Sequence, residues 1–401
     1  MKIFNKNEWK KVKLGDICDL RNGVAIKSED YVTSSNTLNC RMSNIRPDGT
    51  FDILYNAKYL PDNFLEKYKN YLLKDGDLVI AMTDMAGDPK ILGVPTVVKS
   101  NGFNIIQNQR VGKLELLTKN IDENYLKLVL QSKKAKNYFK KFSAGGVQLN
   151  LSKKEILNVP IILPTIEEQK KLSNLFKIIE NFIYLRKEEL VNLHFLNKSL
   201  FTKIFGDIEK KFEYHKLSNI CDVRDGTHDS PEYITTDKRF PLITSKNLKG
   251  DKIDFSEVNF ISEADFNKIN VRSKVDIGDI LMPMIGTIGN PIIVKINKKF
   301  SIKNLALIKF KNSQIINTFL KFLLLSDYFN LIISQKNKGG TQKFLSLSDI
   351  RNFLIPVPPI ELQNKFAERI ENIEKLKFEI EKSIETAQNL YDSLISKYFD
   401  N

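Results

Sequence analysis

Short polar side chains and long hydrogen-bond donors gather in a few turn-rich segments of the sequence. Two of these segments share the skeleton Gly-Gly-x-Gln, at Gly145–Gln148 and, 194 positions later, at Gly339–Gln342. Paired glycines let another backbone approach closely, and a glutamine amide offers both a donor and an acceptor. Such an amide can pair with adenine, as Arg or Lys pairs with guanine. The sequence leaves equally open that each glutamine only caps a helix or holds its own loop.

If the chain binds nucleic acid, segments that differ between its first and second halves are better candidates for reading bases than segments that repeat. The second half contains "DGTHDSP" (Asp225–Pro231) and "TSKN" (Thr244–Asn247), and "CRMSN" (Cys40–Asn44) takes the place of "TSKN" in the first half. Asp84 could accept from a cytosine amino group, although an aspartate that closes a turn is commoner. The candidate base-contacting residues are Arg41, Ser43, Asn44, Gln148, Thr227, His228, Ser245, Lys246, Asn247, Gln342 and Lys343.

Motifs that would make the chain an enzyme are absent from the sequence. No glycine-rich loop ends in Gly-Lys-Ser/Thr, and nothing matches a Pro-Pro-Tyr/Phe amino-methylation pocket. "GDPK" (Gly87–Lys90) has the Asp and Lys of a nuclease without a supporting carboxylate, so we interpret it as a turn. The three Cys and three His lack metal-ligand spacing. We therefore expect a non-catalytic chain that binds no metal or cofactor, with Cys18 and Cys221 as small buried residues.

Composition places the chain among ordinary folded proteins that bind a polyanion. Hydrophobic residues make up 42% of the 401 residues and charged residues 27%, with a net charge of +14. A positive surplus favours nucleic acid, although an AT-rich genome or solubility could also produce it. No run of about 18 apolar residues occurs, and the start "MKIFNKNEWKK" lacks the apolar middle of a signal peptide. We expect a cytoplasmic protein that makes no membrane contact.

The sequence is a tandem duplication. "KLGDICDLRNG" (Lys13–Gly23) matches "KLSNICDVRDG" (Lys216–Gly226) at an offset of 203, and from Tyr125 against Phe319 the offset settles at 194. Matched blocks keep their length while the loops between them vary. In each half, short β-branched runs such as "DLVIAM" precede one amphipathic helix, "DENYLKLVLQSKKAKNYFKKF" or "NTFLKFLLLSDYFNLIISQ". Each half is therefore predicted to begin with a mixed α/β domain.

A long helix is predicted after each domain. Residues 166–205 and 360–399 contain no Gly or Pro, and apolar residues recur in a heptad with few polar interruptions, such as Asn197 and Lys377. Forty helical residues span roughly 60 Å, and each apolar stripe needs a partner, most simply the other helix. The alternative is that each helix packs only on its own domain.

Taken together, these blocks resemble the specificity subunit of type I restriction-modification systems over nearly the whole chain. The matching pieces are the two openings, "GTHDSPEY", "PLITSKNLKGDKID", "IGDILMPMIGTIGNP" and "GGTQKFLSLSDIRNFLIPVPPIELQ". The resemblance implies a non-catalytic subunit whose two domains each read half of a split, asymmetric double-stranded DNA sequence. It also implies two methyltransferase subunits on the helices and two restriction subunits, with S-adenosylmethionine, ATP and Mg on those partners. The first half has "NGVAIKSEDY" in place of "DGTHDSPEY", so the two domains need not use the same loop.

The expected architecture is α/β, with two mixed target recognition domains separated by two long helices packed as an antiparallel coiled coil. Its parts are a first recognition domain (1–164), a first spacer helix (165–207), a second domain (208–358) and a second helix (359–401). Two alternatives stay open: the specificity subunit of an atypical or fused restriction-methylation enzyme, or a protein-binding coiled-coil scaffold with incidental positive charge.

Overall fold

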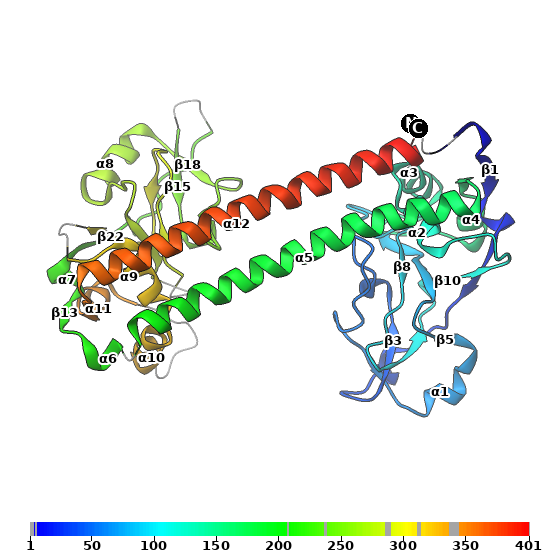
Figure 1. Ribbon diagram of the computed structural model, residues 1–401, viewed down its shortest axis with the longest axis horizontal. Coiled ribbons are helices and arrows are strands. Elements are labelled where there is room, and N and C mark those ends of the chain that lie inside the picture. Colours follow the sequence, from blue (N-terminus) through cyan, green and yellow to red (C-terminus); the bar gives the residue numbers. More distant parts are fainter. Residues whose placement is uncertain are drawn as a thin grey trace. The chain divides into compact units, whose positions relative to one another are not determined.

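The computed structural model describes residues 4, 6–206, 208–235, 239–284, 290–310, 314–336 and 345–400. The chain forms two compact units, one of Met1–Arg186 with Ser383–Asn401 and the other of Lys187–Lys382 (Figure 1). Both long helices contribute to both units, so the domain boundaries expected from the sequence stay a prediction.

The first unit consists of short strands with helices packed beside them. Its strands are β1 (Lys10–Lys13), β2 (Cys18–Asn22), β3 (Thr37–Cys40), β4 (Tyr59–Leu60), β5 (Leu72–Leu73), β6 (Leu78–Ala81), β7 (Thr83–Met85), β8 (Pro95–Val97), β9 (Asn104–Gln107), β10 (Val111–Leu116), β11 (Gln148–Asn150) and β12 (Pro160–Leu163). Its short helices are α1 (Phe64–Lys67), α2 (Glu123–Gln131), α3 (Lys133–Phe142) and α4 (Lys153–Leu157). The larger sheets have the orders β2-β10-β6-β8 and β4-β3-β9-β5, with β1-β12 and β11-β7 as two-stranded pairs.

The second unit repeats this plan. Its strands are β13 (Tyr214–Lys216), β14 (Cys221–Asp225), β15 (Phe240–Ile243), β16 (Leu248–Lys249), β17 (Lys252–Ile253), β18 (Asn259–Ile261), β19 (Ile280–Pro283), β20 (Ile292–Ile293), β21 (Ser301–Ile302), β22 (Leu305–Phe310) and β23 (Leu354–Pro356). Its short helices are α6 (Ile208–Lys211), α7 (Leu217–Ile220), α8 (Glu263–Ser273), α9 (Asn317–Leu324), α10 (Asp327–Lys336) and α11 (Leu347–Arg351). The order β14-β22-β19-β20 reproduces β2-β10-β6-β8, which confirms the mixed fold and the duplication.

The single amphipathic helix predicted in each half is in fact two helices. Ser132 adopts an extended conformation between α2 and α3, and its hydroxyl oxygen accepts from the Ala135 amide. Ser326 lies 194 positions later between α9 and α10, and its hydroxyl accepts from the Phe329 amide. A serine that caps the first turn of a new helix competes with the continuation of the old one. The periodicity alone did not reveal this break.

The Gly- and Pro-free stretches are the long helices α5 (Ile166–Phe205) and α12 (Ile360–Ile395), the latter continued by a π-helical turn (Ser396–Asp400). Within the first unit, Phe176 packs edge-on against Tyr391 at 5.0 Å between ring centroids. Farther along α5, Ile183 clusters with Ala387. The two helices therefore run in opposite directions in this unit.

The heptad stripe also makes helix-to-helix contacts in the second unit, where the Phe201 ring lies 5.5 Å from that of Phe366. The same stripe also enters the domain cores, since Phe176 belongs to the first core and Phe366 to the second. Each helix thus packs both on a domain and on the other helix.

The remaining sequence predictions on burial can be checked directly. Cys18, Cys40 and Cys221 are free and buried, and burial raises the pKa of the Cys40 thiol to about 12. Such thiols behave as small apolar side chains. Among the described residues, no helix is both long and apolar enough to span a bilayer.

Candidate nucleic-acid interface

Three loops of the second unit meet at the edge where two strands run parallel. Strands β15 and β21 pair in parallel, with Ile243 beside Ile302. The Thr227 amide donates to the Ile302 carbonyl oxygen at 3.0 Å, and the Lys303 amide donates to that of Ile243 at 2.9 Å. The segments that follow β14, β15 and β21 therefore emerge side by side.

The first unit builds the same edge. Strands β3 and β9 are parallel, with Cys40 beside Gln107. The Val24 amide donates to the Gln107 carbonyl oxygen, and the Asn108 amide donates to that of Cys40, both at 3.0 Å. The segments after β2, β3 and β9 are thus brought together as their counterparts are in the second unit.

In each unit, a glycine allows the backbone that follows β2 or β14 to approach the neighbouring strand closely. A Cβ on Gly23 would lie 2.2 Å from the Asn108 carbonyl oxygen, and one on Gly226 would lie 2.3 Å from that of Ile302. Any other residue would push the neighbouring strand away. This contact explains why both opening blocks of the duplication end in glycine.

His228 is an exposed titratable side chain of the second edge. Its Nδ1 lies 2.9 Å from Asn304 Oδ1 and its Nε2 lies 2.8 Å from Asp225 Oδ2, while 59% of the side chain is exposed. Asp225 is buried and also binds the Arg272 guanidinium at 2.9 Å. Hydrogen bonds to Asn304 and Asp225 raise the pKa of His228. An imidazolium is favoured here because both ring nitrogens face acceptors.

The rest of this edge carries hydroxyl and ammonium groups. The Thr227 hydroxyl accepts from the Asp229 amide at 3.2 Å, and the Lys303 ammonium donates to the Ser230 hydroxyl. Ser245 and Lys246 are exposed on the turn that follows β15. This edge therefore brings together four predicted residues, Thr227, His228, Ser245 and Lys246.

Asn44 and Asn247 lie in equivalent turns but are buried, with 1% and 7% of their surfaces exposed. The Asn44 side-chain oxygen accepts from the Arg41 backbone amide. Its side-chain nitrogen donates to the backbone carbonyls of Asp52, Ile53 and Tyr55. The Asn247 side-chain oxygen accepts from the Thr244 backbone amide. Its side-chain nitrogen donates to the backbone carbonyls of Asp254 and Glu257. Both amides hold the turn in shape, so we leave them out of the proposed set of base contacts.

The two predicted neighbours of Asn44 differ in whether their polar atoms can be reached. Arg41 and Ser43 are both half-buried, and the Ser43 hydroxyl oxygen is buried without a hydrogen-bond partner among the described residues. Arg41 uses its backbone amide for the turn, which leaves its guanidinium as the long donor of this loop.

Gln148 begins β11, which pairs with β7 and places Gln148 opposite Met85. Gly145 has φ of +130°, and a Cβ there would lie 1.9 Å from the Gln148 carbonyl oxygen, so the loop needs this glycine. The Met82 backbone amide donates to the carbonyl of Arg110, which lies in the third loop of the edge. Strand β7 follows Met82 and ends at Met85, the residue opposite Gln148. At about 3.3 Å per residue, Met85 lies roughly 10 Å along the strand from the three-loop edge.

The two remaining predictions have different outcomes. Asp84 is buried and accepts from the amides of Met85, Ile91 and Leu92, so it closes a turn, the commoner of the two interpretations. Gln342 and Lys343 lie outside the described residues.

Sequence reasoning missed the third loop of each edge. Gln109 and Arg110 are exposed after β9, and Lys303 and Asn304 are half-buried after β21. The signal was a length difference, since three residues separate β9 from β10 whereas two separate β21 from β22. Asn304 has φ of +53°, which permits this tighter turn. Among the described residues, no cluster of His, Cys, Asp and Glu could hold a metal ion.

Comparison with known proteins identifies the family. A family model described as the type I restriction modification DNA specificity domain matches residues 6–194 and again residues 209–387. The specificity subunit of the type I restriction enzyme MjaVIII of Methanocaldococcus jannaschii is 25% identical over 372 residues, covering 83% of each chain.

Two solved structures share the fold over nearly the full length. The S subunit of a type I restriction-modification system from M. genitalium is 15% identical, with a TM-score of 0.56 over 99% of this chain and 97% of that one. A chain solved in work on complex assembly of a type I system is 16% identical, with a TM-score of 0.59 over 98% of this chain and 97% of that one. The chain belongs to the family of type I restriction-modification DNA specificity domains and carries two of them in tandem.

Proposed function

We propose that the chain is the specificity subunit of a type I restriction-modification complex and recognises a bipartite, asymmetric double-stranded DNA sequence. Each domain reads one half through the three loops at its parallel-strand edge. The chain contributes recognition and no catalysis. The observation that carries the proposal is the twofold family match, one on each domain, together with the same three-loop edge in both.

The proposed contacts are the accessible polar residues of these edges. In the first domain they are Arg41, Gln109 and Arg110, with Gln148 farther along, and in the second they are Thr227, His228, Ser245, Lys246, Lys303 and Asn304. Ser43 is left out because its hydroxyl oxygen is buried. Arg110 and Lys303 offer long donors for guanine, and Gln109 and Asn304 offer amides for adenine. Because the side chains of the three loops differ between the domains, the two half-sites should differ in sequence.

The magnitudes favour two domains over one. A good bidentate base contact gives about 1 to 3 kcal/mol of discrimination, so a domain that reads a few base pairs is not selective enough for a genome. Two domains on one chain add these free energies. We propose that α5 and α12 set the unread spacer between the half-sites.

The helices are also the proposed docking place for two methyltransferase subunits, and two restriction subunits would complete the complex. S-adenosylmethionine, ATP and Mg are proposed to act on those partners, in the cytoplasm, where the DNA is. One structurally similar chain comes from work on complex assembly of a type I system, which supports a multi-subunit partner set.

Exchange of the second domain tests whether each domain recognises its own half of the DNA sequence independently. Residues 206–358 would be replaced by the equivalent domain of another family member. Methylated genomic DNA would then be sequenced from a strain with the natural chain and from one with the exchanged chain. Only one half of the methylated motif should change. A change in both halves, or in neither, contradicts the proposal.

Copurification separates the alternatives. A specificity subunit should copurify with a methyltransferase, and the complex should methylate adenine within a split site. A coiled-coil scaffold would bind proteins without any sequence-dependent methylation, and a fused enzyme would carry methylation and cleavage on one partner chain.

A further inference from the structure

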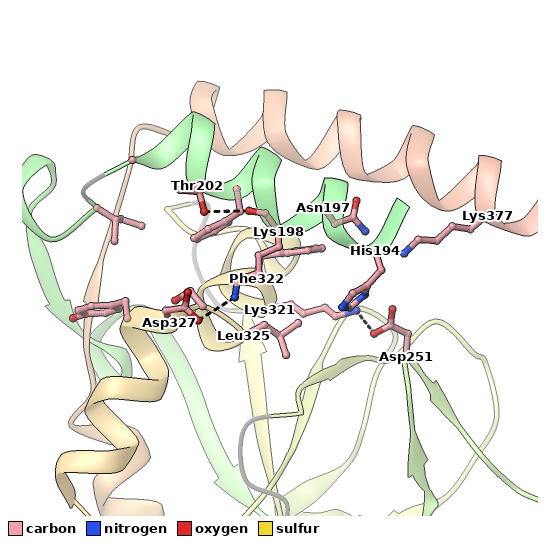
Figure 2. A pocket seen from close by; sticks show the side chains of 15 residues that line it. His194, Asn197, Lys198, Thr202, Asp251, Lys321, Phe322, Leu325, Asp327 and Lys377 are labelled. Carbon is pink, nitrogen blue, oxygen red and sulfur yellow. Dashed lines mark hydrogen bonds and ion pairs between the residues drawn. The ribbon is translucent and has the colours of Figure 1, made fainter. Parts of the chain in front are cut away.

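A cavity of about 540 Å³ opens in the second unit beside helix α5 (Figure 2), and none of its lining residues belongs to the three-loop edge. Its walls come from α5, from α9 and the start of α10, and from single residues of the β16–β17 hairpin and α12. This volume falls within the range of small-molecule sites. The lining residues that matter for the argument are His194, Asn197, Lys321, Phe322, Tyr328 and Lys377.

Asn197 is the least expected residue of this lining. It occupies a heptad position where an apolar residue is the rule, and only 4% of its surface is exposed. Its side-chain oxygen is buried and has no hydrogen-bond donor among the described residues. A buried amide oxygen without a donor destabilises a protein, so a donor supplied from outside would explain its presence.

Ammonium groups surround the same cavity. Lys321 is 8% exposed and contacts Asp251 at 2.8 Å, Lys198 contacts Asp327 at 3.1 Å, and Lys377 contacts Glu374 at 3.0 Å. Each ammonium has three donors and, among the described residues, contacts one carboxylate, so donors are left for an anion.

The lysines already hold one carboxylate of this lining in its charged form. Burial raises the pKa of Asp251, but the charges of Lys321, Lys377 and Lys295 and the hydrogen bond from Lys321 outweigh it and leave that pKa below its usual value. Three lysines and two aspartates, Asp251 and Asp327, line the cavity, so an entering phosphate would share these ammonium groups with the aspartates.

Flat rings complete the lining. Phe322 and Tyr328 are half-buried, and His194 is exposed at the cavity wall. In Figure 2, His194 and Lys377 both extend toward the cavity, and Asn197 lies above them on α5. Faces of this kind stack on heteroaromatic bases.

We propose that this cavity binds a free nucleoside monophosphate. The Asn197 amide would bond the edge of the base, the aromatic faces would stack on it, and Lys321 and Lys377 would bind the phosphate. This site is separate from the DNA-reading loops, so it goes beyond the proposed function.

The test is calorimetric titration of the full chain with AMP and GMP, with adenosine and inorganic phosphate as separate arms. The Asn197→Leu variant removes the amide and restores an apolar heptad residue, so it should fold at least as well as the natural chain. Asn181→Leu places the same leucine at an exposed position of α5 in the first unit and serves as the matched control. Thermal unfolding of each variant checks the fold.

At least one nucleotide should bind the natural chain and Asn181→Leu at least tenfold more tightly than either adenosine or phosphate. Asn197→Leu should weaken that binding at least tenfold, and Lys377→Gln should weaken it through the phosphate alone. Inorganic phosphate binding as tightly as the nucleotide would show a mere anion site and overturn the proposal. So would a lack of binding to the natural chain at millimolar nucleotide, or unchanged affinity in Asn197→Leu.

Discussion

Gln169 and Gln363 stand 194 positions apart, are almost fully buried, and make the same three hydrogen bonds. Gln169 accepts from the Asp122 amide and donates to the carbonyls of Asn120 and Pro164. Gln363 accepts from the Ile316 amide and donates to the carbonyls of Gln314 and Pro358. Each glutamine therefore ties the first turn of a long helix to the start of a domain helix, α2 or α9.

Replacement of Gln169 by Leu should lower the free energy of unfolding of the first unit by about 2 to 4 kcal/mol, because three backbone groups lose their partner. Urea unfolding, followed by hydrogen exchange of peptides from each unit, measures the effect and its location. Gln388→Leu is the control, since this exposed glutamine on α12 bonds only to Asp392 in the part of the chain described. Equal loss of protection in both units, or none, would contradict this role.

Gly145 and Gly146 allow a matched test of the Gly-Gly-x-Gln loop. An Ala at Gly145 would need φ near +130° and would clash with the Gln148 carbonyl oxygen, whereas a Cβ at Gly146 meets nothing within 4 Å. We expect Gly145→Ala to cost about 1 to 3 kcal/mol of stability and to lower DNA affinity. Gly146→Ala should leave both near those of the natural chain. Thermal unfolding and DNA binding by fluorescence anisotropy compare the pair, and similar behaviour of the two variants would rule out the strained loop.

Substitutions of two neighbouring residues in one turn should have different effects, one on DNA binding and the other on the free energy of unfolding. Lys246→Ala should leave stability unchanged, weaken DNA binding and, if the lysine contacts a phosphate, reduce the slope of log affinity against log salt by about 1. Asn247→Ala should instead lower stability by about 1 to 3 kcal/mol, since its amide holds four backbone and hydroxyl groups. Denaturation and salt-dependent anisotropy on both variants decide this. A large affinity loss in Asn247→Ala at unchanged stability would return that residue to the contact set.

The sequence predicted the domains and the long helices better than it predicted the residues proposed to contact DNA. The stretch without Gly or Pro coincides with α5, and the duplication predicted two similar mixed α/β domains, because repeated apolar patterns record burial directly. It did not separate Asn247 from Lys246, since a short amide in a polar turn looks the same whether it faces DNA or its own backbone. It also missed Lys303 and Asn304, which reach the edge only through the parallel pairing of β15 and β21.

Protonation of His228 should make the second unit more stable at low pH. Its folded pKa is raised by Asn304 and Asp225, so the added stability is fully present below the unfolded value of about 6.5 and is lost as pH rises through the folded pKa. Arg272 opposes this shift because it shares Asp225. The natural chain should exceed His228→Asn in unfolding free energy at pH 5.5, and the difference should shrink by pH 8.5. NMR titration of the imidazole gives the pKa, and a gap that widens with pH would contradict the ion pair.

Lengthening both long helices by seven residues tests whether they set the spacer. Insertions between Arg186 and Lys187 and between Lys382 and Ser383 leave the Phe176–Tyr391 and Phe201–Phe366 contacts within their own units. A heptad adds about 10.5 Å at 1.5 Å per residue and nearly preserves the apolar face, which corresponds to about three base pairs at 3.4 Å each. We expect both half-sequences to be kept while the original spacing is no longer methylated, with any new motif about three base pairs longer. The same insertion in α5 alone shifts one stripe against the other and should destabilise the chain. Full methylation of the original motif by the doubly lengthened chain would show that the helices do not measure the spacer.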